Sequence, residues 1–171
     1  MRREFWRLVL TGVGIVLTLA LQTTVVSRLP LPGGRPDLLL VVVVAAALGG
    51  GVNVGVGIGF TVGLAADLLS PHPAGLLALI YLVVGLTVGR IDSERQRGVG
   101  WSVIVVVVAG AASLVGYVLL LTLVSRHAPS LPSQLADLPT SLAYDVLLTP
   151  FVVPVVTFLE RTSRPTMAFR V

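Results

Sequence analysis

The stretch that decides the fold reads GVNVGVGIGFTVGLAADLL, residues 51–69. Its glycines at every fourth position share one face of a helix, because four residues turn an α-helix by about 400°. A row without side chains lets another helix backbone approach closely, whether that helix belongs to this chain or to a partner. We therefore predict a membrane helix with a close-packing face, and this face comprises Gly51, Gly55, Gly59 and Gly63.

Apolar runs surround this glycine-rich stretch on both sides. Hydrophobic residues make up 55% of the 171 residues, charged residues make up 12%, and the mean hydropathy is +0.97. Soluble domains carry about 25% charged residues, whereas about 20 apolar residues suffice to cross a bilayer. The composition predicts an all-α, polytopic integral membrane bundle that forms a single transmembrane domain. Its six helices are expected at approximately 5–26, 36–48, 52–69, 74–89, 101–125 and 139–159.

The second and third of these helices are the least certain crossings, because both are short. They form either a tight hairpin or a broken, re-entrant pair, and the sequence leaves both arrangements open. Pro36 and Asp37 begin the second helix. Proline suits the first turn of a helix, and an acidic residue suits the positive end of the helix dipole.

The arginines predict the orientation of the helices. The chain has 12 basic residues, all arginine, and nine of them lie on the cytoplasmic side if the N-terminus is inside. This distribution favours an N-in, C-in topology. Arg90, Arg95 and Arg97 are expected to anchor it and to contact anionic membrane lipid, and docking of a cytoplasmic protein is the sharper alternative. Because the basic residues lie between apolar runs, we predict no nucleic-acid partner.

Polar residues near the outer ends of three predicted helices form a candidate pocket. Asp67 and Asp145 are acids within membrane helices, where a carboxylate facing lipid is costly, so they should face protein or water. Gln22 lies at a similar depth in the first helix, and Tyr144 precedes Asp145. We predict an outward-facing polar pocket formed by these four residues. Alternatively, each side chain reaches separately for the membrane interface.

No catalytic constellation accompanies this pocket. The chain has no cysteine, and its two histidines lie in predicted turns without a metal-ligand spacing. Asp67 and Asp145 could mimic the paired aspartates of an intramembrane protease, but the motifs that accompany such a pair are missing. We therefore predict no enzyme activity, no metal and no cofactor.

Several runs of the chain resemble the rod shape-determining protein MreD family. The runs are LQTTVV at 21–26, RPDLLLVVVVAAALGG at 35–50 and GFTVGLAADLLSPHPAGLLALIYLVVG at 59–85. In that family a glycine-rich helix ends in an aspartate, and a short turn and a glycine open the next helix. The matching residues here are Gly63, Asp67 and Gly75.

This resemblance implies a non-enzymatic scaffold in the inner membrane, within the bacterial cell-elongation machinery. The implied partners are an MreC-like bitopic protein and the peptidoglycan synthases of the lateral wall. The family is also similar in fold to the S-components of energy-coupling-factor transporters, so a substrate-binding transport subunit with Asp67 and Asp145 at its ligand is the alternative. The first helix lacks the A-x-x-x-A signature that S-components use for coupling, which favours the scaffold.

Overall fold

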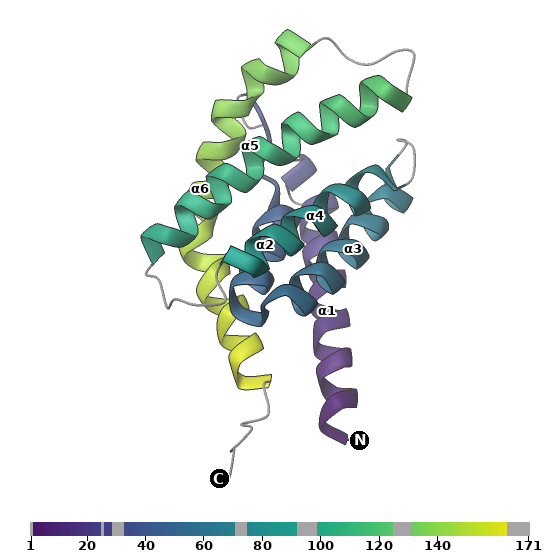
Figure 1. Cartoon of the computed structure of the whole chain (residues 1–171), viewed down its shortest axis with the longest axis vertical. Coiled ribbons are helices and arrows are strands. Elements are labelled where there is room, and N and C mark those ends of the chain that lie inside the picture. Colours follow the sequence, from purple (N-terminus) through teal and green to yellow (C-terminus); the bar gives the residue numbers. More distant parts are fainter. Residues whose placement is uncertain are drawn as a thin grey trace.

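The computed structural model describes residues 2–24, 26–28, 33–70, 75–91, 99–124 and 131–163, and these residues contain no β-strand. Six α-helices account for nearly all of them (Figure 1). The prediction of an all-α fold with six helices is confirmed. In chain order the elements are α1 (Arg2–Thr24), the 3-10 helix η1 (Val26–Arg28), α2 (Leu38–Gly50), α3 (Val52–Leu69), α4 (Leu76–Ile91), α5 (Val99–Val124) and α6 (Leu131–Ser163).

Helix α2 forms the centre of the molecule. It packs against α3, α4, α5 and α6, and Val41, Val43 and Val44 are completely buried. A helix that is apolar all round is stable only when it is enclosed in this way. Its 13 residues extend over roughly 20 Å, which is less than the hydrocarbon thickness of about 30 Å. Neighbouring helices therefore shield α2 along its length.

The glycine row of α3 lies against α4. A Cβ atom at Gly55 would lie 2.6 Å from the carbonyl oxygen of Gly85, and one at Gly63 would lie 2.5 Å from the Cα of Ala78. A Cβ at Gly59 would overlap the backbone carbonyl of Tyr81. The predicted packing face is thus occupied within the chain, and a partner helix cannot use it.

Gly51 has a different task from the other three glycines. It separates α2 from α3 and adopts a φ of 78°, a conformation that L side chains rarely take. Its amide also donates to the carbonyl of Ala47 at 2.8 Å, which closes the last turn of α2. Gly51 therefore sets the sharp reversal between the two short helices.

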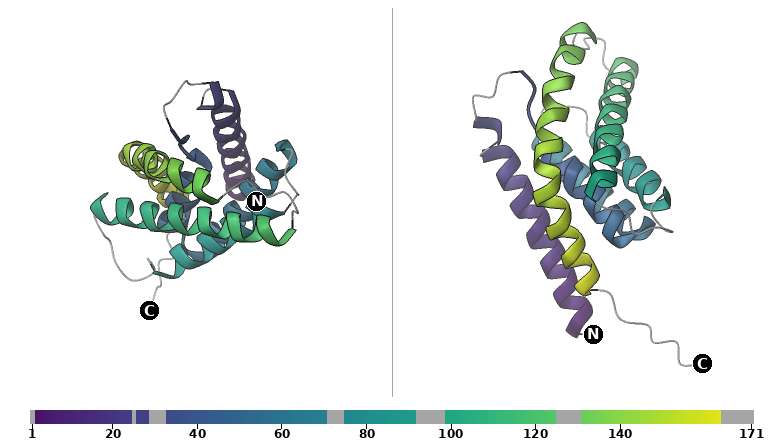
Figure 2. Two further views of the ribbon diagram at one scale, coloured as in Figure 1. Left: turned by 90° about the horizontal axis from the view of Figure 1, so that it is seen from above. Right: turned by 90° about the vertical axis from the view of Figure 1, so that its left-hand side faces the viewer.

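The outer surface is apolar enough for a membrane protein. By length and composition, residues 52–69, 100–123 and 139–159 could each cross a bilayer. The shorter apolar helices are α2, α4 and residues 12–24 of α1. The N-terminal end of α1 and the C-terminal end of α6 project from the same end of the molecule (Figures 1 and 2). Helix α6 begins at Leu131, ahead of the predicted start at Pro139, because the helix continues through that proline.

Candidate functional site: a polar cavity where helix ends meet

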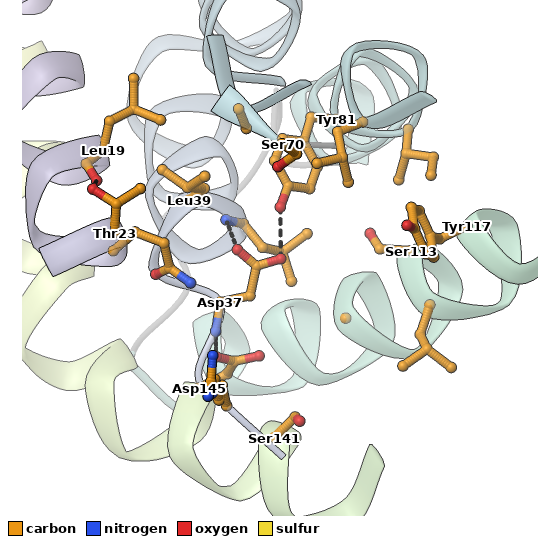
Figure 3. Close-up of a pocket in the computed structure, with 18 of the residues that line it drawn as sticks. Leu19, Thr23, Asp37, Leu39, Ser70, Tyr81, Ser113, Tyr117, Ser141 and Asp145 are labelled. Atoms are coloured by element: carbon orange, nitrogen blue, oxygen red, sulfur yellow. Dashed lines mark hydrogen bonds between the residues drawn. The ribbon is translucent and has the colours of Figure 1, made fainter. Parts of the chain in front are cut away.

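A cavity of about 420 Å³ lies where α1 and α3 end and α2 and α4 begin. The middle parts of α5 and α6 close it from the other side (Figure 3). Among the ten lining residues with polar side chains, two are carboxylic acids and one is a cation. These ten are Gln22, Thr23, Arg35, Asp37, Ser70, Tyr81, Ser113, Tyr117, Ser141 and Asp145.

Asp37 stands at the start of α2 and connects it to α4. One carboxyl oxygen accepts the amide of Leu40 at 3.1 Å and caps the helix, as acidic residues at this position do. The other accepts the hydroxyl of Tyr81 at 2.6 Å (Figure 3). The helix-start motif Pro36-Asp37 therefore lies inside the site. In the sequence, this position is recognisable because Asp37 follows Arg35 and Pro36 and precedes a long apolar run.

Asp145 joins α6 to the same segment. Its Oδ1 accepts the backbone amide of Asp37 at 2.7 Å, and the side chain is only 3% exposed. One turn earlier in α6, the hydroxyl of Thr140 accepts the amide of Gly34 at 2.7 Å. Two side chains of α6 thus hold the extended residues that lead into α2.

Gln22 supplies the contact from α1. Its amide group donates to the carbonyl oxygen of Pro36 at 3.0 Å, and its side-chain oxygen accepts the amide of Leu38 at 3.1 Å. One side chain therefore satisfies a peptide group on each side of Asp37. Because α1, α4 and α6 all bond to this short segment, the cavity has a preorganised wall.

Asp67 lies outside the cavity, contrary to the expectation that it would share a pocket with Asp145. It is 2% exposed and accepts three backbone amides, from Gly75 at 2.8 Å, Leu77 at 3.2 Å and Ala78 at 3.1 Å. These are amides at the first turn of α4, which have no partner within the helix. Asp67 is thus a capping residue supplied by the neighbouring helix.

The remaining predicted residues are placed as follows. Tyr144 is half-buried on α6 but does not line the cavity. Arg90 is exposed in the last turn of α4, whereas Arg95 and Arg97 lie outside the described residues. Ser113, which was not predicted as a site residue, is buried on α5 and lines the cavity. A serine among apolar residues gives too weak a signal to be recognised without its surroundings.

The site presents polar groups that could bind a ligand. Within the described part of the chain, no group of three His, Cys, Asp or Glu side chains could hold a metal ion. The carboxyl groups of Asp37 and Asp145 are engaged in backbone and hydroxyl hydrogen bonds that fix their orientation. The cavity therefore presents hydrogen-bond acceptors to a ligand, and the hydrogen bonds between helices hold these acceptors in place.

Comparison with known families agrees with this architecture. The family model for the rod shape-determining protein MreD matches residues 2–162, nearly the whole chain. No curated protein and no solved structure matches the chain. The family match covers all six helices, from the loosely attached α1 to the last turns of α6. The chain is a membrane protein that belongs to the rod shape-determining protein MreD family.

Proposed function

We propose that the protein is a non-enzymatic, multi-pass component of the bacterial inner membrane that binds an MreC-type bitopic protein and supports lateral peptidoglycan synthesis. The family match over residues 2–162 carries this proposal, since membership assigns a role in rod shape determination within a membrane complex. The apolar outer faces support a bilayer location. The N-terminal end of α1 and the C-terminal end of α6 project from one end of the molecule, as an N-in, C-in protein requires (Figure 1).

The mechanism we propose is positional: the helices hold a partner's transmembrane helix in a fixed place. The glycine row cannot do this, because α4 covers it. An apolar groove of about 460 Å³ between α4 and α5 is better suited. Ala112 and Gly116 lie in this groove one turn apart, with Val83 and Val108 among the aliphatic side chains beside them. Small residues flanked by aliphatic ones favour close packing of a second membrane helix.

The test is affinity purification of the tagged chain from native membranes in mild detergent, with mass spectrometry of the proteins that accompany it. We expect an MreC-type protein and wall synthases. Ala112→Phe should fill the groove and lower their recovery several-fold, whereas Val115→Phe, at an exposed position of α5 outside the groove, should not. Normal recovery with Ala112→Phe would exclude the groove as the binding site of the partner helix. The groove would then be filled by lipid chains. Absence of the partners from the unmodified protein would reject the function.

The cavity favours one alternative, a substrate-binding subunit of a small-molecule transporter. The buried carboxyl group of Asp145 and the size of the cavity fit a small ligand. Such a subunit would be recovered with an ATPase pair and a coupling protein in the same purification. The scaffold reading predicts that neither is present.

A further inference from the structure

Two side-chain oxygens that line the cavity accept no hydrogen bond from the described residues, and one of them, the Oγ of Ser113, is a buried atom. The Oγ of Ser113 is buried and has no partner among the described residues, and the side chain is 9% exposed. Asp145 uses Oδ1 for the amide of Asp37, while its Oδ2 accepts no hydrogen bond from the described part of the chain. Buried polar groups are nearly always paired in native proteins. A ligand that carries N–H donors would satisfy these oxygens.

Both acceptors face the same space. A Cβ atom at Gly110 would lie 3.9 Å from Oδ2 of Asp145, so this carboxyl oxygen looks onto the Gly110 face of α5. Ser113 is one turn further along α5, and residues three apart lie on one helix face with Cβ atoms roughly 5–6 Å apart. All three residues line the cavity. A single small group with several N–H donors could bond to both oxygens.

The acidic and basic side chains that line the cavity lie at different positions in it. The carboxyl group of Asp145 lies beside the backbone of Asp37, to which it bonds, and both acids line the cavity. Asp37 is already engaged by Leu40 and Tyr81, so Asp145 has the free acceptor. The cation of the lining is Arg35, which is exposed. A complementary ligand has a cationic donor at its inner end and an anion at its outer end.

The position and the size of the cavity restrict the class of ligand further. It lies at the ends of α1 to α4 and beside the middle parts of α5 and α6, and its 420 Å³ admits a small polar molecule or a lipid headgroup. We propose that this cavity binds a primary ammonium group with an anion a few atoms away, held by Asp145 and Ser113 and balanced by Arg35. Phosphoethanolamine has this chemistry, either as the headgroup of a membrane lipid or as a free solute.

The experiment uses the full chain and matched probes. Phosphocholine has the same anion and a similar cation as phosphoethanolamine, but it has no N–H donor. Purified protein in detergent is titrated with either free compound while the thermal unfolding midpoint is recorded. Protein exposed to an equal mixture of phosphatidylethanolamine and phosphatidylcholine is then examined for retained lipid by native mass spectrometry. We expect a preference for the ethanolamine form of about tenfold or more, the effect of one hydrogen bond to a charged group.

Variants test the two proposed acceptors. Asp145→Asn keeps an oxygen for the amide of Asp37 but removes the acidic group, and it should abolish the preference. Ser113→Ala should reduce it several-fold. Ser102→Ala removes another buried hydroxyl of α5 that does not line the cavity, so the preference should be retained. If Asp145→Asn does not fold, the binding preference of Ser113→Ala alone tests the proposal.

The outcomes separate the two sources of ligand. Preference among lipids but not among free compounds identifies a lipid headgroup, and the reverse identifies a soluble zwitterion. Equal binding of the ethanolamine and choline forms in both assays would overturn the proposal. So would an unchanged preference in folded Asp145→Asn and Ser113→Ala. The inference does not rest on the partner proteins, so co-purification results leave it untouched.

Discussion

At the scale of the residue, three buried or partly buried aspartates perform three different tasks. Asp37 caps its own helix and bonds to Tyr81, Asp67 caps a helix that follows a turn, and Asp145 holds the backbone of Asp37. In each case a carboxyl group in an apolar bundle accepts backbone amides that would otherwise have no partner. Such amides are costly to leave unpaired when water is absent.

Removal of the Asp67 carboxyl group should destabilise the fold. Asp67→Ala leaves three amides at the start of α4 without an acceptor, and we expect a loss of at least about 2 kcal/mol in the free energy of unfolding. Asp67→Asn keeps one acceptor oxygen and should lose less. Unfolding of the purified protein by SDS titration measures both. An unchanged midpoint for Asp67→Ala would show that the three bonds contribute nothing.

At the scale of the element, helices α3 and α4 form the most closely packed pair of the molecule. Their glycines alternate across an antiparallel contact, with Gly55 against Gly85 and Gly89 against Val52. Backbone atoms rather than side chains form the interface, so it gains dispersion contacts that a larger residue would remove. Rotamer changes cannot accommodate a substitution here.

Gly59→Leu should therefore disrupt the chain itself. The added side chain meets the Tyr81 carbonyl, which cannot move without shifting α4, and we expect a loss of more than about 3 kcal/mol. Gly57→Leu is the matched control, since a Cβ at this exposed position meets nothing within 4 Å. Thermal unfolding in detergent compares the two. Equal midpoints would mean that α3 and α4 do not pack through this face.

Helix α1 is attached more weakly, since its helix–helix contacts are with α2 and α3 and are few. The two hydrogen bonds of Gln22 therefore contribute much of the attachment of α1 to the segment before α2. Gln22→Leu has a similar size but cannot bond to Pro36 or Leu38, so the Leu38 amide should exchange with solvent deuterium faster, by about fivefold or more. Thr18→Val, at a half-buried position of the same helix that does not contact Pro36 or Leu38 through hydrogen bonds, is the control. Unchanged exchange in Gln22→Leu would mean that other contacts fix the segment.

At the scale of the whole molecule, the arrangement of helices predicts which ends share a side of the membrane. The cavity lies where α1 and α3 end and α2 and α4 begin, as expected for helices that alternate in direction. The arginine distribution predicts that the N-terminal end of α1 and the C-terminal end of α6 face the cytoplasm.

This orientation can be measured directly, because the chain contains no cysteine. In intact cells, an impermeant thiol reagent should label Arg28→Cys, at the end of η1, and should leave Arg95→Cys unlabelled until the membrane is opened. Both positions must be labelled after permeabilisation. Labelling of Arg95→Cys in intact cells would reverse the proposed topology.

The sequence by itself determined the class of protein, the number of helices and the glycine row. These follow from local quantities, namely apolar run length, residue period and the positions of glycine and proline. The start of α2 was predicted two residues early, at Pro36, whereas Asp37 is the N-cap and the helix begins at Leu38.

Only the tertiary structure decided which polar groups share a site. Asp67 and Asp145 are equally plausible pocket residues when depth alone is considered, yet one caps α4 and the other lines the cavity. Ser113 and Tyr81 enter the site through the rotation of α5 and α4 about their axes. Helix rotation depends on packing against several neighbours at once, and that is a property of the assembled bundle rather than of any one segment.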